Sequence, residues 1–478
     1  MNRGQSIDAL AAGEKWDLLV IGGGASGLGA AVDAAARGYR TALVEAHDFA
    51  KGTSSRSTKL IHGGVRYLRQ GNISLVRESL RERALLLRNA PDLSRKQSFI
   101  IPAYGLTDRA FYGVGLRAYD ALAGRLSLGP SQWLSRAEVL RRIPNVQSSG
   151  LRGGILYYDG QFDDARLAIC LAQRLHDLGG FAANYLPVER LIKEHDRIAG
   201  ALVRDAESGR EFEIRARAVI NATGVFTDSI RRLDDPAARE LVTASQGAHV
   251  VVDRSFLRGD AALMVPKTRD GRVLFAIPWQ DRVVIGTTDT PVDSASLDPH
   301  PFPKEIQFIL EHSAMYLAKA PSESDVLSVF AGLRPLVKAD AENTSQLSRD
   351  HSITTSKSGL VSIAGGKWTT YRKMGEDVVT RAAEVGGLDR RPPRTEQLSL
   401  LDRAGHTVAR FVREEMARTV EDVLARRQRT LILDARAAIE AAPSVASEMA
   451  KELGRDQAWE SAQVESFRAL ARKYLLSG

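Results

Sequence analysis

The sequence contains a single cysteine, Cys170, and this scarcity limits the chemistry open to the chain. One thiol cannot form an intrachain disulfide, a CxxC metal site or a cysteine-ligated iron–sulfur cluster. Cys170 lies in the helical pattern ARLAICLAQRL, which indicates a buried packing thiol. Sparse cysteine is typical of a reducing compartment, so we expect a cytoplasmic protein.

Long hydrophobic runs are also missing from the sequence. No run approaches the roughly 20 apolar residues that a membrane-spanning helix needs, and the first twelve residues lack the apolar core of a secretory signal. Any membrane contact is therefore expected to be peripheral, on the inner face of the cell membrane. The best candidate is residues 109–128, RAFYGVGLRAYDALAGRLSL, which suits either an interfacial segment or an ordinary surface helix.

Two further absences concern metals and nucleic acids. No two histidines stand at metal-ligand spacing beside carboxylates, so we expect no metal site. Lys and Arg (66) exceed Asp and Glu (58), which gives a net charge of +8. This excess suits anionic small molecules, anionic lipid surfaces or nucleic acid. It forms no contiguous basic stripe with aromatics, so we expect no nucleic-acid partner.

A nucleotide-binding pattern opens the chain. Residues 16–45 read WDLLVIGGGASGLGAAVDAAARGYRTALVE, in which an apolar strand over 17–21 precedes a small-residue helix over 25–37. A GxGxxG motif lies between the two, followed by a second strand that ends at Glu45. This context is required for the dinucleotide-binding fingerprint. Its glycines are Gly22, Gly24 and Gly27.

Each part of this fingerprint has a physical role. Gly22 allows the tight turn, Gly24 lets the backbone approach a pyrophosphate, and Gly27 lets helix and strand pack closely. Ala25 and Ser26 open the helix, whose free N–H groups bind phosphate oxygens, and Glu45 accepts from ribose hydroxyls. Later strand–turn pieces at 218–224 (AVINATG) and 359–367 (GLVSIAGGK) favour FAD over NAD, because flavoproteins wrap their extended cofactor with several distant segments.

Residues 55–67, SRSTKLIHGGVRY, gather cations, hydroxyls, a histidine and two glycines with little apolar periodicity. Together with other segments, this stretch resembles the FAD-dependent glycerol-3-phosphate dehydrogenase family from about residue 14 to 385. A C-terminal run, EEMARTVEDVLARRQRTLILDARAA, is similar to that family's C-terminal helical domain. The segments that carry the resemblance are VIGGGASGLGAA, TSSRSTKLIHGGVRYL, DDARL, NATGVFTD, IPWQDRVVIGTTDT, AGLRPL and GGKWTTYRKM.

The resemblance implies that the 55–67 stretch lies along the flavin and closes one side of the substrate pocket. Gly63 and Gly64 would let the backbone approach the flat ring, and nearby hydroxyls would serve flavin and phosphate oxygens. Beyond the fingerprint residues, the expected FAD-binding residues are Thr53, Ser54, Ser55, Ser57, Lys59, Leu60, His62, Gly63, Gly64, Ala222, Thr223, Gly224, Gly332, Gly366, Lys367 and Thr369.

A small phosphorylated polyol needs several converging cations, preferably arginines. Arg66 in GGVRY, Arg334 in AGLRPL and Lys367 in GGKWTTY each stand beside small or aromatic residues. The resemblance adds Tyr67 and Arg349 to these expected substrate-binding residues. The expected substrate is sn-glycerol 3-phosphate and the product dihydroxyacetone phosphate.

The implied reaction moves a hydride from C2 of the substrate to flavin N5, while a base removes the proton from O2. His249, at the start of an apolar strand, is our first candidate for the base or a proton relay, and His62 is its rival. Arg334 could stabilise the developing alkoxide. A quinone is the expected electron acceptor, and oxygen, as in related oxidases, is the alternative. The identity of the base and the oligomeric state, a homodimer among the options, stay open.

The expected fold is α/β: a doubly wound Rossmann-like FAD-binding domain (14–90, 150–240 and 331–385) interleaved with an antiparallel-sheet substrate domain (91–149 and 241–330). A linker at 386–397 precedes a small helical domain at 398–478. The spacing of Val412, Met416, Val420 and Val423 predicts an amphipathic helix there, with an Arg-rich end that docks on the body rather than on lipid. This domain is shorter than the family pattern, which puts membrane and oligomer contacts in doubt.

Other functions are compatible with parts of this pattern. An FAD-dependent amine or 2-hydroxyacid oxidoreductase of the same fold would need one carboxylate-binding arginine rather than several converging cations. A flavin-binding sensor without turnover would need no anion pocket. The cluster of hydroxyls, histidine and cations in residues 55–67 favours an enzyme over a sensor.

Overall fold

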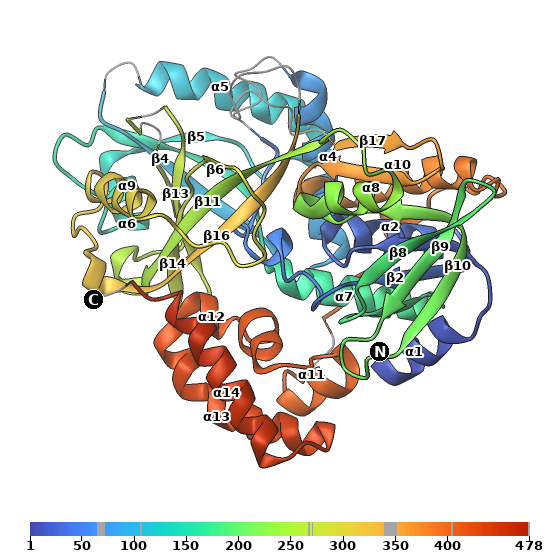
Figure 1. Ribbon diagram of the computed structural model, residues 1–478. Helices are drawn as coiled ribbons and strands as arrows, with labels where there is room; N and C mark the ends of the chain where they lie inside the picture. Colours follow the sequence, from blue (N-terminus) through green and yellow to red (C-terminus); the bar gives the residue numbers. More distant parts are fainter. Residues whose placement is uncertain are drawn as a thin grey trace.

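The computed structural model describes residues 1–64, 72–105, 108–265, 268–269, 271–338, 351–402 and 405–476. Within them the chain forms two large sheets side by side, with a group of C-terminal helices below both (Figure 1). The first sheet carries the predicted dinucleotide-binding turn. The second carries His249 and Arg334, which are predicted to act on the substrate.

The first sheet has the order β17-β18-β10-β1-β2-β7 and is parallel from β18 to β7. Its near-continuous apolar strands are buried on both faces, as parallel strands require. The hairpin β8–β9 continues antiparallel from β10. The strands are β1 (Trp16–Ile21), β2 (Thr41–Val44), β7 (Phe181–Ala183), β8 (Val188–Glu194), β9 (Arg197–Arg204), β10 (Glu211–Asn221), β17 (His351–Thr355) and β18 (Val361–Gly365).

Helices rich in small and aliphatic residues cover this sheet. α2 (Ala25–Ala36) packs between α7 (Asp164–Asp177) and α10 (Tyr371–Val385). Cys170 lies on α7 and is 3% exposed, which confirms the predicted packing thiol. The other helices of this part are α1 (Arg3–Ala11) and α8 (Thr227–Asp234).

The second sheet is mostly antiparallel, as the alternating pattern of residues 241–330 predicts, although β4 and β12 pair in parallel. Its order is β15-β11-β14-β13-β12-β4-β6-β3, with β16 beside β11 and β5 beside β6. The strands are β3 (Leu60–Ile61), β4 (Ser94–Ala103), β5 (Gln132–Ser135), β6 (Gly153–Phe162), β11 (Val242–Asp253), β12 (Ala262–Val265), β13 (Leu274–Trp279), β14 (Arg282–Gly286), β15 (Thr290–Val292) and β16 (Val326–Val337).

One helix over this sheet carries most of the 109–128 segment. α5 (Asp108–Ala123) buries Leu116, Tyr119 and Ala123 against β4, β6 and α4 (Ile73–Asn89), so it covers an apolar core. The remaining helices of this part are α6 (Arg136–Arg142) and α9 (Pro303–Ala314). No helix in the described ranges is both long enough and apolar enough to span a bilayer.

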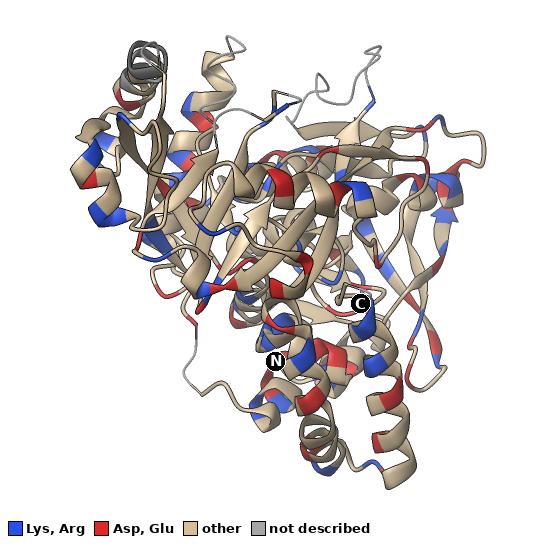
Figure 2. Cartoon of the chain, turned by 90° about the vertical axis from the view of Figure 1, so that its left-hand side faces the viewer, with Lys and Arg blue, Asp and Glu red and all other residues tan. Residues whose placement is uncertain are grey.

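The C-terminal region contains α11 (Val408–Glu415), α12 (Thr430–Leu433), α13 (Ala435–Leu453) and α14 (Gln457–Arg472). Its apolar residues share a core with Val251, Trp279, Val284 and Phe330 of the second sheet. Basic and acidic residues are interspersed over these helices (Figure 2). The region is therefore docked on the body of the protein.

The prediction of one helix through Val412, Met416, Val420 and Val423 is wrong. The first helix ends before Met416, which adopts φ +56°, and a π-helical turn begins later at Asp422–Arg427. All four apolar side chains are nevertheless buried. Their spacing thus reported burial correctly but did not reveal the break, because a turn that returns to the same core preserves the apolar pattern.

Candidate active site

The turn between β1 and α2 has the close contacts that only glycine permits. Gly22 adopts φ +112°, and a Cβ there would lie 2.6 Å from the Ala222 oxygen. A Cβ on Gly27 would lie 1.8 Å from the Gly22 oxygen. The first turn of α2 has no side-chain cap from Gly24; instead Ser54 Oγ accepts from the Ala25 N–H at 2.9 Å.

Gly27→Ala tests this packing. Since the added methyl group cannot fit against the Gly22 carbonyl, α2 must shift away from β1. We expect FAD affinity to fall by at least about 10-fold, since a shift of the turn misplaces its phosphate-binding N–H groups. Gly29→Ala is a poor control because it too is crowded; Gly115→Ala, at a helical glycine of α5 with open space at its Cβ, is the matched one. FAD affinity equal to wild type in Gly27→Ala would contradict the assignment.

Glu45 follows β2 and faces this turn. Its carboxylate accepts from the N–H groups of Gly23 (2.5 Å) and His47 (2.9 Å). Burial raises the pKa of Glu45 in spite of these two hydrogen bonds. The carboxylate is thus held at the end of the strand where the fingerprint places a ribose.

A cavity of about 310 Å³ extends from this turn. Its walls come from β1, β2, the turn after β10 and the turn after β18, which are distant in sequence but adjacent in the sheet. The predicted FAD-binding residues in its lining are Gly22, Gly24, Ala25, Ser26, Glu45, Thr53, Ser54, Ala222, Thr223, Gly224, Gly366 and Lys367.

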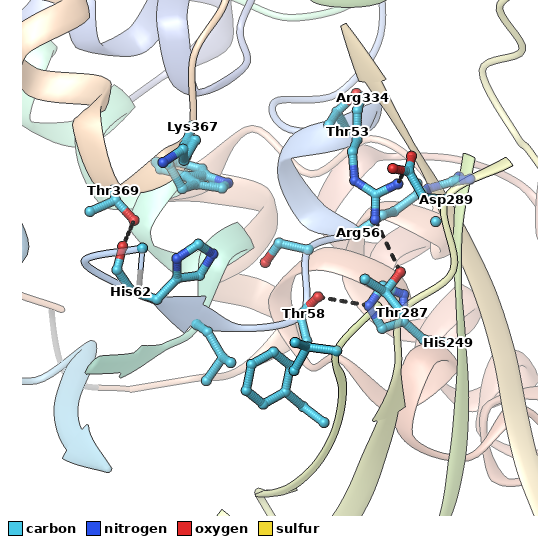
Figure 3. Close-up of a pocket in the computed structure, with 18 of the residues that line it drawn as sticks. Thr53, Arg56, Thr58, His62, His249, Thr287, Asp289, Arg334, Lys367 and Thr369 are labelled. Carbon is cyan, nitrogen blue, oxygen red and sulfur yellow. Dashed lines mark hydrogen bonds and ion pairs between the residues drawn. The ribbon is translucent and has the colours of Figure 1, made fainter. Parts of the chain in front are cut away.

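A second cavity, also of about 310 Å³, lies toward the antiparallel sheet (Figure 3). The two cavities share lining residues, so they form one elongated site: Thr53, Pro335, Gly366, Lys367 and Trp368. The predicted residues that line the second cavity are Thr53, Ser57, Leu60, His62, Gly64, His249, Gly332, Arg334, Gly366, Lys367 and Thr369.

Four predicted FAD-binding residues line neither cavity. Gly27 packs under the turn, and Gly63 donates its N–H to Asp159 at 3.2 Å. Ser55 and Lys59 are buried beneath the loop, where the Lys59 ammonium donates to Asp164 at 2.7 Å. Three predicted substrate-binding residues lie outside the described residues: Arg66, Tyr67 and Arg349.

His249 lies in β11 and is 2% exposed. Its ring stacks on Phe330 with centroids 4.5 Å apart, and its Nε2 is 2.9 Å from Thr58 Oγ1. Figure 3 shows Thr58 pointing at the imidazole from the loop. Burial, assisted by the charges of Lys59 and Arg334, holds the pKa of His249 well below 6.5. The imidazole is therefore neutral near pH 7 and able to accept a proton.

Arg334 projects from β16 with a fixed guanidinium. It donates to Asp289 Oδ1 (3.1 Å), to Thr287 Oγ1 (3.2 Å) and to the Thr288 oxygen (2.9 Å). A Cβ on Gly247, in the neighbouring strand, would lie 2.4 Å from Arg334 Nη2. Glycine at that position therefore leaves space for the guanidinium.

Sequence reasoning missed several residues of the second cavity. Arg56 stands within the SRSTKLIHGGVRY stretch and Asp289 within TTDT, so their segments gave the signal. Thr58 was expected among the hydroxyls that serve flavin and phosphate oxygens, but its contact with His249 was not. Arg272, which precedes β13, and Asp159, in β6, had no such signal, because these two strands come to the cavity only through the order of the second sheet. A cation and a carboxylate at scattered positions look like ordinary surface residues until the strands are paired.

The site fits FAD. It is elongated, its glycine turn and the N-terminus of α2 suit a pyrophosphate, and Glu45 suits a ribose. Close backbone approach continues along the cavity at Gly332, where a Cβ would lie 2.7 Å from the Arg56 oxygen. No cluster of three potential metal ligands occurs in the part of the chain that the structure covers.

Comparison with known proteins agrees with an FAD-binding site. The model of the FAD dependent oxidoreductase family matches residues 17–372, and that of the C-terminal domain of alpha-glycerophosphate oxidase matches residues 380–460. The chain belongs to the FAD-dependent oxidoreductase family, and FAD is its cofactor.

Several proteins similar to this chain are glycerol-3-phosphate dehydrogenases. The chain is 46% identical over 393 residues to a probable mitochondrial glycerol-3-phosphate dehydrogenase of Caenorhabditis elegans, covering 79% of this chain and 54% of that protein. The mitochondrial glycerol-3-phosphate dehydrogenase of Homo sapiens is 44% identical over 404 residues (81% and 55%). The glycerol-3-phosphate dehydrogenase of Bacillus halodurans complexed with FAD superposes with a TM-score of 0.81 at 27% identity, covering 99% and 97%. The chain thus spans about half the length of the two mitochondrial relatives.

Proposed function

We propose that the chain oxidises sn-glycerol 3-phosphate to dihydroxyacetone phosphate. The observation that carries this proposal is the pair of adjoining cavities, one at the dinucleotide turn and the other lined by a group of cations and a neutral histidine. FAD, when bound, supplies the acceptor for the hydride that leaves C2 of the substrate. The similarity to glycerol-3-phosphate dehydrogenases supports the same substrate.

The cations of the second cavity would bind the substrate phosphate. Arg334 lies on β16, and Lys367 lies in the turn after β18. Arg56 and Arg272 add two more positive groups to the lining of the same cavity. A dianionic phosphate is matched by converging guanidinium groups, which bind oxygens in bidentate geometry. Arg66, Tyr67 and Arg349 stay sequence predictions for the same task.

The proton from O2 would reach His249. Thr58 Oγ1 lines the cavity and lies 2.9 Å from His249 Nε2, so its hydroxyl can pass a proton to the imidazole. Arg334, fixed by three hydrogen bonds, would stabilise the developing negative charge on O2. His62 also lines the cavity and stays the rival base.

The neutral state of His249 predicts an unusual pH profile. A base must be unprotonated, so the rate of flavin reduction is lost as the pH falls through the pKa of His249. Because that pKa lies well below 6.5, we expect the rate to hold down to and below pH 6.5. Anaerobic stopped-flow measurement of the rate of flavin reduction from about pH 5 to about pH 9 shows where this loss at acidic pH begins. A rate that already falls by half between about pH 7 and pH 6.5 would contradict the assignment.

A quinone is the proposed electron acceptor, which would bring the protein to a membrane surface. Oxygen is the second candidate, favoured by the match of residues 380–460 to a domain named for an oxidase. Turnover with a soluble quinone analogue, with product dihydroxyacetone phosphate measured directly, tests both the reaction and the acceptor. Stoichiometric hydrogen peroxide in air would identify an oxidase, whereas turnover on amino acids or 2-hydroxyacids but not on glycerol 3-phosphate would overturn the proposed substrate.

A further inference from the structure

Three arginines of the C-terminal region enter the core of the FAD-binding part. Arg426, Arg427 and Arg429 are each at most 3% exposed. Arg426 and Arg427 belong to the π-helical turn, Arg429 is the residue before α12, and all three pair with carboxylates of the body. Arg426 and Arg427 bind Asp48, whereas Arg429 binds Asp164.

Asp164, the first residue of α7, is buried and forms hydrogen bonds with the loop of residues 53–59. Its Oδ2 accepts from the Ser57 N–H (3.1 Å), Ser57 Oγ (2.7 Å) and Lys59 Nζ (2.7 Å). Its Oδ1 accepts from Arg429 Nη2 at 2.7 Å. Arg429 and Lys59 also donate to the Ser55 oxygen at 3.0 and 2.8 Å. The loop backbone is thereby fixed at Ser55 and Ser57.

The opposite side of the same loop faces the active site. Thr53 Oγ1 donates to the Leu333 oxygen at 2.6 Å, Ser54 Oγ accepts from Ala25, and Thr58 contacts His249. A shift of the loop would therefore change the helix end that receives phosphates and the partner of the proposed base together. All of these contacts fall within residues 53–59 of one short loop.

Of the two cations that bind Asp164, Arg429 is the one whose charge does not depend on pH. Burial lowers the pKa of Lys59 to about 7 in spite of Asp164. Burial alone would raise the pKa of Asp164, but the charges of Lys59 and Arg429 hold it below its ordinary value. A guanidinium stays charged at every relevant pH, so Arg429 is the constant counter-charge when Lys59 loses its proton.

The surroundings of the two cations are otherwise apolar or acidic. Both lie over the Trp279 ring, at 5.5 Å for Arg429 and 5.4 Å for Lys59, and Lys59 also lies over Phe330 at 5.3 Å. Arg429 Nε is 3.5 Å from Asp163. Arg429 adopts φ +67°, a backbone conformation that a non-glycine residue holds only when its surroundings compensate the strain.

We propose that Arg429 is a positioning residue through which the C-terminal helical region holds loop 53–59, and with it the active-site hydroxyls, in the geometry that FAD and substrate require. Arg429 contacts neither cavity and acts through Asp164, Ser57 and the Ser55 carbonyl. The C-terminal region is in this way part of the working active site. The activity readout of this inference rests on the proposed function; its structural readout does not.

The matched comparison is Arg429→Lys against Arg166→Lys in the FAD-bound protein. Arg166 lies two residues beyond Asp164 on the same helix, is 4% exposed, and binds Glu415 and Asp402, so it ties the same two regions together without contacting the loop. Both changes keep the charge and remove the fixed guanidinium geometry. They are expected to lower stability similarly.

We expect Arg429→Lys to speed amide hydrogen exchange in residues 53–59 and to slow flavin reduction by saturating substrate by about 10-fold, since small misplacements of positioned groups carry such costs. Arg166→Lys should leave both within about twofold of wild type. Equal behaviour of the two variants in both readouts would overturn the proposal. If Arg429→Lys gives no folded protein, Asp164→Asn, which keeps an acceptor for Ser57, takes its place with the same expected and contrary results.

The two proposals fail in different ways. Wild-type protein that glycerol 3-phosphate does not reduce would remove the proposed function. The comparison of hydrogen exchange in residues 53–59, together with the FAD affinity of each variant, would still decide the role of Arg429. Unchanged exchange and unchanged FAD affinity in Arg429→Lys would remove that role even in an active enzyme.

Discussion

His249→Asn is expected to lower the rate of flavin reduction by sn-glycerol 3-phosphate by about 10²–10⁴-fold, the usual contribution of general acid–base catalysis. Asparagine has no group that takes up a proton at neutral pH. FAD should remain bound, because His249 lines only the cavity nearer the second sheet. The measurement is anaerobic stopped-flow reduction at saturating substrate.

His62→Asn is the matched control, because His62 lines the same cavity from the loop side. We expect a smaller loss of rate for this variant than for His249→Asn. The reverse order, with His62→Asn losing more than about 10²-fold and His249→Asn nearly unaffected, would transfer the role of base to His62.

Arg334→Met is expected to lower kcat/KM for sn-glycerol 3-phosphate by about 100-fold or more, as removal of one partner from a desolvated charge pair does. The guanidinium is held by Asp289, Thr287 and Thr288, so the substitution removes a positive group of fixed position from the cavity. Asp289 keeps the Ser245 hydroxyl as a donor, which limits the disturbance of the apoprotein.

How the loss of kcat/KM divides between kcat and KM identifies what Arg334 binds. A rise in KM alone would show that Arg334 binds the phosphate in ground state and transition state alike, whereas an equal fall in kcat would show stabilisation of the alkoxide. Activity toward glycerol, which lacks the phosphate, separates the two further. An Arg334→Met enzyme with wild-type kcat/KM would remove Arg334 from the site.

The local part of this architecture could be predicted from the sequence. The β1–α2–β2 unit, its three glycines and Glu45 follow from apolar runs and turn residues within 30 positions, and the structure has them where expected. The strand at 218–224 lies beside β1, and the strand at 359–367 lies beside it in turn, in the same sheet. Such elements are readable because strand, helix and turn patterns are local.

Contacts between distant residues could not be predicted in the same way. Lys59 resembles a cofactor ligand in the sequence, but its ammonium is buried against Asp164, which lies 105 residues further along the chain. Asp164 in turn meets Arg429 across 265 residues. The break at Met416 was hidden because both segments pack on one core. Nothing in a local pattern distinguishes a buried ion pair from a ligand-binding group.

The account depends most directly on reduction of the bound flavin by the proposed substrate. The decisive measurement is an anaerobic titration of the purified FAD-bound protein with sn-glycerol 3-phosphate, followed through the visible absorbance of oxidised flavin. We predict loss of this band with sn-glycerol 3-phosphate and no loss with glycerol, because the cations of the second cavity bind the phosphate. A flavin that stays oxidised with sn-glycerol 3-phosphate, or that glycerol reduces equally well, would contradict the account.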